Sequence, residues 1–86
     1  MAKKKIELEA TVEEMLSDDY KERFWAEYWQ VRTRFEKLTA MIDKYLVGKL
    51  DFEPDCPIQL LMTQASYMRM YMQVLEARAK IEKIKL

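Results

Sequence analysis

Residues 17–48, SDDYKERFWAEYWQVRTRFEKLTAMIDKYLVG, decide the fold that we predict for this chain. Apolar side chains recur in this stretch at alternating intervals of four and three residues, the pattern of a helix lying along a partner helix. The row comprises Phe24, Tyr28, Val31, Phe35, Leu38, Ile42 and Tyr45. Ser17 before two aspartates is typical of an N-cap, and Gly48 is typical of a residue that ends a helix. The pattern therefore predicts one long helix over residues 17–47.

A second stretch, residues 57–84, shows the same helical spacing. Pro57 suits the first turn of a helix, because proline lacks an N–H and its φ is already close to helical. Two neighbouring rows of side chains keep the spacing: Leu61, Ala65, Met68, Met72, Leu75 and Ala79 form one, and Leu60, Gln64, Tyr67, Tyr71, Val74, Arg78 and Ile81 the other. A loop over residues 48–56 joins the two helices and is short enough to make them antiparallel neighbours.

The first sixteen residues are expected to form an arm or a short helix. Residues 11–14, TVEE, have the form of a capping box in which Thr11 caps the helix and Glu14 reaches back to the Thr11 N–H. The lysines at positions 3–5 predict a solubilising arm, since three charges give only a modest attraction to nucleic acid or to an acidic partner. The predicted fold is all-α, with residues 1–86 forming a single domain built on an antiparallel hairpin of two long helices.

Both long helices are apolar over a wider surface than one partner helix can cover. Trp25 and Trp29 lie one turn apart beside the first row, and Met68 and Met72 lie one turn apart on the second helix. Because exposed apolar surface favours association, we expect hairpins to join into a helical bundle, with these four residues at the interface between copies. The tryptophans could alternatively stack on a base, and the methionines could fill the core or adapt to varied partner helices.

The composition argues against several functions. Fifteen basic and fifteen acidic residues cancel, so the chain as a whole has no charge that would attract nucleic acid or an anionic membrane. Its apolar residues never run for the roughly 18 positions that a membrane span needs. A single cysteine, Cys56, excludes an internal disulfide and fits the reducing cytoplasm.

The residue types available also argue against an enzyme. The chain has no histidine, which removes histidine acid–base chemistry and most transition-metal sites. Its one glycine cannot build a glycine-rich phosphate loop. Cys56 has no histidine to activate it, so a structural position near a helix start is the better interpretation. We therefore expect no catalytic residue, no metal and no cofactor.

Polar side chains on one row of the second helix are the candidates for ligand binding: Gln64, Tyr67, Tyr71 and Arg78. Arg78 is unusual because the rest of its row is largely apolar. Its guanidinium could bind a phosphate, or it could pair with Glu36, Asp43 or Glu82, or extend to the end of the bundle.

The second helix also carries a resemblance. Residues 60–78, LLMTQASYMRMYMQVLEAR, follow the pattern LLxxQxxxMxxYxxxLxxR, and a first amphipathic helix with Glu-Lys-Leu at residues 36–38 precedes them. This chain resembles, over about residues 18–84, a family of short phage-encoded helical proteins named after a gene product of a crAss-like phage. The resemblance implies a phage or prophage origin, a two-helix design and no catalytic residues.

A phage origin directs the functional hypotheses toward counter-defence. In size and layout the chain is similar to small helical oligomers that sequester nucleotide immune signals between subunits. The first hypothesis is therefore a non-enzymatic binding protein of the host cytoplasm that sequesters or inhibits a host defence component, such as a nucleotide signal. The alternative is a structural or adaptor module that oligomerises and binds another protein. A third hypothesis, a nucleic-acid binder, is disfavoured by the zero net charge.

Overall fold

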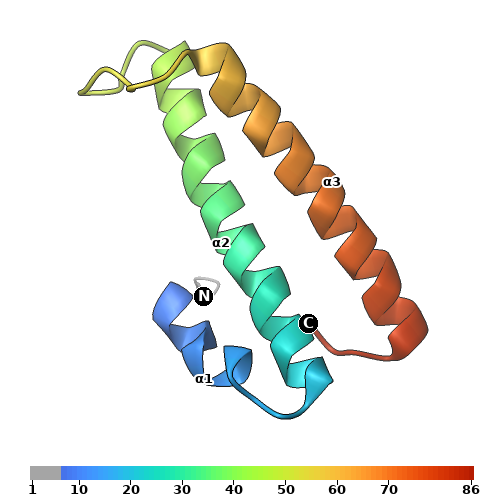
Figure 1. Ribbon diagram of the computed structural model, residues 1–86. Helices are drawn as coiled ribbons and strands as arrows, with labels where there is room; N and C mark the ends of the chain where they lie inside the picture. Colours follow the sequence, from blue (N-terminus) through green and yellow to red (C-terminus); the bar gives the residue numbers. More distant parts are fainter. Residues whose placement is uncertain (1–6) are drawn as a thin grey trace, which may run out of the picture.

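The computed structural model describes residues 7–86, and every regular element in that part of the chain is helical. A 3-10 turn, η1 (Leu8–Thr11), leads into α1 (Val12–Met15), which is followed by α2 (Tyr20–Leu46) and α3 (Ile58–Glu82). The two long helices run side by side in opposite directions, joined by the loop at one end (Figure 1). The predicted all-α hairpin with a short N-terminal helix is confirmed, while its self-association stays a prediction. The predicted lysine arm lies outside the described residues.

The predicted apolar row on α2 forms the seam with α3. Phe24 and Tyr28 are buried together with Leu75 and Ala79 of α3 in one cluster. Five partly buried side chains pack around this cluster: Trp29, Val31, Met72, Ile84 and Leu86. On α3 the row that contains Leu75 and Ala79 faces α2, and the neighbouring row faces outward. Small alanines on the inner row let the two helix backbones approach each other closely.

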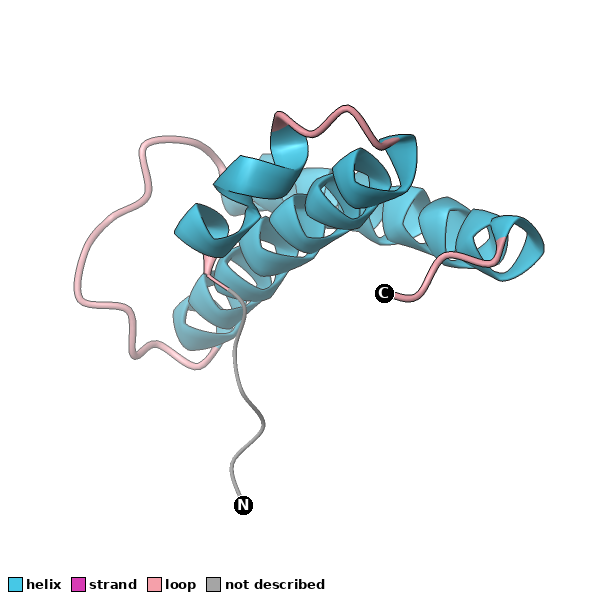
Figure 2. Cartoon of the chain, turned by 90° about the horizontal axis from the view of Figure 1, so that it is seen from below, coloured by secondary structure: helices cyan, strands magenta, loops and turns pink. Residues whose placement is uncertain are grey.

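The N-terminal segment packs on a different face of α2 (Figure 2). The side-chain amide of Gln30 donates a hydrogen bond to the hydroxyl of Thr11 over 3.1 Å, and Thr11 itself is fully buried. On the same face of α2, Ala26 and Thr33 are 0% and 2% exposed. In the described part of the chain α2 is thus the central element, because α3 contacts no helix other than α2.

The helix starts differ from the sequence prediction in three places. Pro57 is the N-cap of α3, with ψ 141°, and not a residue of its first turn. Thr11 does not cap α1, because its hydroxyl donates a 2.7 Å hydrogen bond back to the Leu8 carbonyl. Asp19, and not Ser17, is the N-cap of α2, and its carboxylate accepts a hydrogen bond from the Lys21 N–H over 2.9 Å. The Ser17 hydroxyl instead accepts from the Asp19 N–H over 3.0 Å, and this local turn delays the helix.

Both long helices end in a left-handed residue. Gly48 has φ +74°, and the Lys49 N–H reaches back to the Lys44 carbonyl over 2.8 Å, which confirms the predicted stop. At the end of α3 the left-handed residue is Lys83, with φ 59°, and the Ile84 N–H bonds the Ala79 carbonyl over 2.8 Å. This turn sends the last residues of the chain back toward α2, where Ile84 packs against the core.

Candidate ligand-binding face of helix α3

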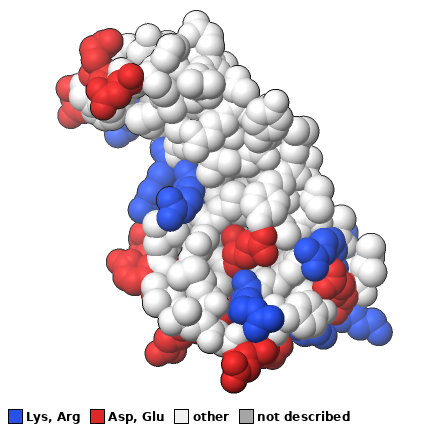
Figure 3. Space-filling model, in the orientation of Figure 1, with Lys and Arg blue, Asp and Glu red and all other residues white. Residues whose placement is uncertain are grey.

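The side of α3 next to the row that packs on α2 is an exposed and largely apolar surface. We call it the outer face of α3 and define it by seven residues: Leu60, Gln64, Tyr67, Tyr71, Val74, Arg78 and Ile81. Its apolar members are strongly exposed, with Leu60 at 60%, Tyr67 at 65% and Ile81 at 81%. Atoms of uncharged residues cover α3 over most of its length in the space-filling view (Figure 3).

A shallow depression lies at the start of this face. Its volume is ≈ 470 Å³, and it is lined by Cys56, Leu60, Leu61, Thr63, Gln64, Tyr67, Met68 and Tyr71. Three of the four predicted ligand residues, Gln64, Tyr67 and Tyr71, therefore lie around one hollow. Two phenol rings and an amide beside apolar walls suit a flat ligand with polar edges. No lysine or arginine lines this depression.

Arg78, the fourth predicted ligand residue, lies further along the same face and outside the depression. Its guanidinium is held by the Glu82 carboxylate, with nitrogen–oxygen distances of 2.7 and 3.3 Å, and it lies 4.8 Å from the centre of the Phe24 ring. The hydrogen bond with Arg78 lowers the pKa of Glu82, and it raises the pKa of Arg78. Of the three carboxylates considered from the sequence, Glu82 is the one that Arg78 contacts.

Glu82 also accepts a hydrogen bond from the Tyr20 hydroxyl over 3.1 Å, which ties the end of α3 to the start of α2. This hydrogen bond is the main cause of the raised pKa of Tyr20. All three side chains are on the surface, where such polar contacts contribute little to stability. The Arg78 guanidinium is therefore paired but accessible.

The residues predicted at the interface between copies lie partly inside the hairpin. Trp29 packs against the core, and its indole N–H is buried without a hydrogen-bond partner. Trp25 is half-buried, with its ring centre 6.4 Å from that of Trp29. Met72 packs against the core, whereas Met68 lines the depression on α3. Their role between copies stays a prediction.

A second depression, of ≈ 300 Å³, lies beside Trp25 and brings together residues from both ends of the described chain. It is lined by Glu14, Lys21, Glu22, Trp25, Lys83, Ile84 and Lys85. Three lysines and two glutamates leave it weakly cationic. Sequence reasoning missed this grouping because only the turn at Lys83 brings the C-terminal lysines back to the start of α2.

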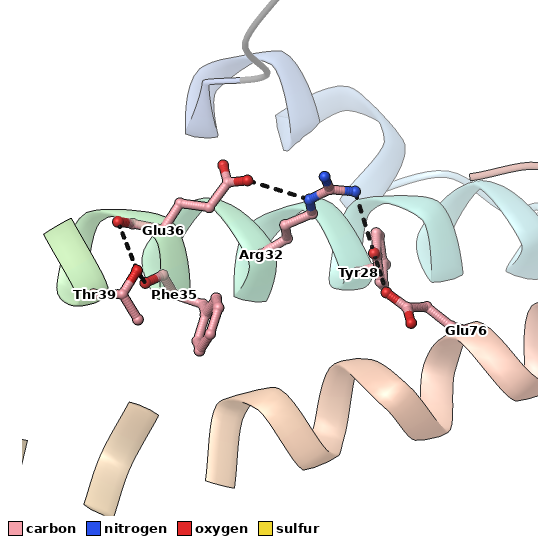
Figure 4. Close-up of polar contacts among 6 residues, drawn as sticks. All are labelled: Tyr28, Arg32, Phe35, Glu36, Thr39 and Glu76. Carbon is pink, nitrogen blue, oxygen red and sulfur yellow. Dashed lines mark hydrogen bonds and ion pairs between the residues drawn. The ribbon is translucent and has the colours of Figure 1, made fainter. Parts of the chain in front are cut away.

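A polar chain crosses the hairpin seam next to the core (Figure 4). The Tyr28 hydroxyl donates a 2.6 Å hydrogen bond to the Glu76 carboxylate of α3, and Arg32 donates to the Tyr28 oxygen over 3.4 Å. Arg32 also reaches Glu36 over 3.4 Å, and its guanidinium lies 4.7 Å from the centre of the Trp29 ring. Burial and the hydrogen bond to Glu76 raise the pKa of Tyr28. Each polar side chain of this network therefore has a partner within the protein.

Other candidate chemistry is sparse in the part of the chain that the structure describes. Within residues 7–86, the cysteine and the acidic residues form no group of three that could hold a metal ion. The Cys56 sulfur is half-buried and lies 3.8 Å from the Pro57 carbonyl oxygen. None of the helices in residues 7–86 is both long enough and apolar enough to span a membrane.

The hairpin and its exposed, largely uncharged outer face define a class of small all-α proteins built on two long helices. Comparison with known families places the chain more narrowly. The chain belongs to the Sequestin family, whose model matches residues 18–81 and so covers α2, the loop and nearly all of α3. No curated protein and no solved structure matches the chain.

Proposed function

We propose that this chain is a non-enzymatic binding protein that sequesters a small nucleotide signal, and that it serves a phage or prophage against a host defence system in the host cytoplasm. The observation that carries the proposal is the depression on α3, around which Gln64, Tyr67 and Tyr71 converge. The name of the Sequestin family agrees with a sequestering role. The resemblance of residues 60–78 to a phage-encoded family supports the origin.

The chemistry of the depression suits such a ligand. The rings of Tyr67 and Tyr71 can stack on a base, because every base offers a π-face and stacking contributes about 1–3 kcal/mol per base. The Gln64 amide can both donate to and accept from the polar edge of a base. The phosphates would need a cation, and Arg78 is the arginine on the same face of α3.

Thermal denaturation in the presence of cyclic nucleotides tests this proposal. A ligand present at 100 times its Kd should stabilise the folded protein by about 2.7 kcal/mol, which raises the Tm. The variants Tyr67→Ala and Arg78→Ala should lose most of the shift. Tyr45→Ala, which removes a tyrosine from α2 that is 37% exposed, is the matched control and should keep it.

Two results would count against the nucleotide proposal. One is the absence of a Tm shift with every cyclic di- and trinucleotide in the panel. The other is a shift that survives both Tyr67→Ala and Arg78→Ala, since binding would then occur elsewhere on the molecule.

A second candidate function is supported by the exposed apolar residues of α3. In this alternative, the chain is an adaptor whose outer face binds an amphipathic helix of another protein. The adaptor function predicts that a defence protein protects Tyr67 from solvent, whereas nucleotides do not protect it. Hydrogen exchange of α3 with each candidate present separates the two functions.

A further inference from the structure

We propose that the outer face of α3 packs against the same face of a second copy, antiparallel about a two-fold axis, and that this brings the partner's Arg78 to the depression at the start of α3. The pairing of the helices follows from features of this chain alone. Only the idea that the composite site holds a nucleotide rests on the proposed function.

The outer face of α3 leaves a large apolar surface open. Five large apolar residues of the outer face are exposed by 42–81%, and Met70 beside them by 51%. Together these side chains expose on the order of 700 Å², close to the roughly 800 Å² per partner that a standard interface buries. A surface of this size on one helix is large enough for a stable dimer.

The outer face of α3 also lacks the charges that a solvated helix face normally carries. Between Ile58 and Leu75 the only charged residue of α3 is Arg69. This arginine does not belong to the outer face, because it lies on the opposite side of the inner row, where it lines a separate depression with Thr39 and Ile42 of α2. A helix that stays solvated on one side normally carries charges there, whereas a helix that is apolar all round is buried.

The residue spacing along the outer face is the same in both chain directions. From Leu60 to Arg78 the intervals are four, three, four, three and four residues. Two antiparallel copies in this register pair Leu60 with the partner's Arg78, Gln64 with the partner's Val74, and Tyr67 with the partner's Tyr71. The two-fold axis then passes through a cluster of four tyrosines, and both copies make identical contacts.

The charges at the two ends of α3 favour antiparallel over parallel pairing. The loop before α3 is acidic, with Asp51, Glu53 and Asp55, while the opposite end carries Lys80, Lys83 and Lys85. Antiparallel copies place the acidic loop of each next to the basic end of the other. Parallel copies would place like charges together at both ends, which is unfavourable.

The arrangement completes the depression with the cation that it lacks. Leu60 lines the depression, and the register places the partner's Arg78 opposite Leu60. The guanidinium is now held by Glu82 in a surface ion pair with the Arg78 side chain 48% exposed. Because such pairs contribute little, an anionic ligand can compete for this arginine. Two equivalent composite sites would form, one at each end of the dimer.

The first experiment measures the mass of the unmodified protein and of Tyr67→Glu/Tyr71→Glu by light scattering over a range of concentrations. The unmodified protein should be dimeric, and the variant should dissociate with a Kd at least about 100-fold weaker, because four buried carboxylates would meet at the axis. Tyr45→Glu, with one exposed tyrosine of α2 replaced, is the control and should stay dimeric. Circular dichroism should show unchanged helix content in both.

The second experiment tests the direction through charge reversal. Variant one, Glu53→Lys/Asp55→Lys, has two basic ends, and variant two, Lys80→Glu/Lys83→Glu, has two acidic ends. Each should dimerise at least about 10-fold more weakly alone than the unmodified chain, and an equimolar mixture should form a heterodimer of restored affinity. A parallel dimer would give a different pattern, because like charges already meet at both of its ends: each variant alone would dimerise about as well as the unmodified chain, and the mixture would associate more tightly than the unmodified chain.

Three outcomes would overturn the proposal. A monomeric unmodified protein would leave the outer face to a different partner. A Tyr67→Glu/Tyr71→Glu variant that stays dimeric would place the interface elsewhere, for example at Trp25. Charge-reversed variants that fail to recover on mixing would exclude the antiparallel direction. None of these measurements uses a ligand, so a dimer that binds no nucleotide would reject the proposed function and keep this inference.

Discussion

Tyr28 is the residue on which the hairpin seam depends most directly, since it belongs to both the apolar core and the polar chain. It is 2% exposed, its ring packs in the core cluster, and its hydroxyl donates to Glu76. The edge of its ring meets Trp29, with the ring centres 5.5 Å apart at an angle of 89°. One side chain thus joins α3 to α2 by two kinds of contact.

Removing the hydroxyl should weaken the fold without opening a cavity. We expect Tyr28→Phe to lower the free energy of unfolding by about 1–2 kcal/mol near pH 7, because a hydrogen bond to a charged partner is lost. The neutral tyrosine is the stabilising form, and its pKa in the folded protein is raised above the usual 10.0. Its contribution is therefore complete below pH 10.0 and lost as the pH rises through the higher folded value.

Urea denaturation at a series of pH values checks both parts of this prediction. The difference in the free energy of unfolding between the unmodified protein and Tyr28→Phe should become smaller in the alkaline range. Tyr45→Phe, where the hydroxyl is exposed, should show no comparable difference at pH 7. A Tyr28→Phe variant as stable as the unmodified protein would show that Glu76 gains as much from water as from the tyrosine.

Lys83 is the only non-glycine residue with positive φ in the described part of the chain. A left-handed backbone costs a residue with a Cβ about 1–2 kcal/mol, and glycine avoids that cost. We expect Lys83→Gly to raise the free energy of unfolding by about 1 kcal/mol, measured by urea denaturation. Lys83→Ala is the control, because it removes the charge but keeps the Cβ, and it should give no such gain.

At the scale of the elements, α2 has a partner on two faces and α3 on one. The face of α2 that carries Phe24 and Tyr28 meets α3, and the face that carries Gln30 meets the N-terminal segment. α3 has only its inner row covered, so it leaves more of its apolar surface exposed than α2 does. This asymmetry is the physical basis for placing a second copy on α3.

The inner row of α3 should be sensitive to loss of volume. Leu75 is 2% exposed and belongs to the core cluster. We expect Leu75→Ala to lower the free energy of unfolding by about 3 kcal/mol, because it removes buried apolar contacts and leaves a cavity. Thermal and urea denaturation give the value, and a loss under 1 kcal/mol would mean that the seam collapses around the gap.

The matched control makes the same change on the surface. Leu16 is 80% exposed in the turn between α1 and α2, so Leu16→Ala should change the stability by less than about 0.5 kcal/mol. The contrast separates burial from any general effect of replacing leucine by alanine.

For the whole molecule, size sets the energetic context. A chain of 86 residues buries a limited share of its surface, and the core cluster at the hairpin seam has four buried residues, two of them aromatic. The C-terminal turn adds Ile84 and Leu86 to this core, so the ends of the chain help to close the hairpin. A small core of this kind gains most from association, since a dimer buries further apolar surface without additional chain.

The elements that depend on local sequence were predictable. The four–three rows predicted both long helices, Gly48 predicted the end of α2, and the short loop predicted the antiparallel hairpin. Errors occurred where one polar side chain had a competing local partner. Thr11 and Ser17 have capping side chains, yet each forms a different hydrogen bond in the folded chain.

The candidate site was predictable only in part. Periodicity grouped Gln64, Tyr67 and Tyr71 on one row, and the structure places these three around one depression. The ion-pair partner of Arg78 could be identified only from the fold, because the sequence offered three carboxylates. Which of them Arg78 contacts depends on where the folded helices place each one. The lysines beside Trp25 were not foreseeable, since they come from opposite ends of the chain.

The stretches 17–48 and 57–84, with the short loop between them, determined by themselves that this protein is a helical hairpin, because apolar spacing and helix stops act over a few residues. Only the tertiary structure decided which apolar surface stays open. α3 carries two rows with the same spacing, and α2 covers the row with the smaller side chains at Ala65 and Ala79, where the backbones can approach. The other row, with Tyr67 and Tyr71, is left facing outward because one helix can cover only one side of its neighbour.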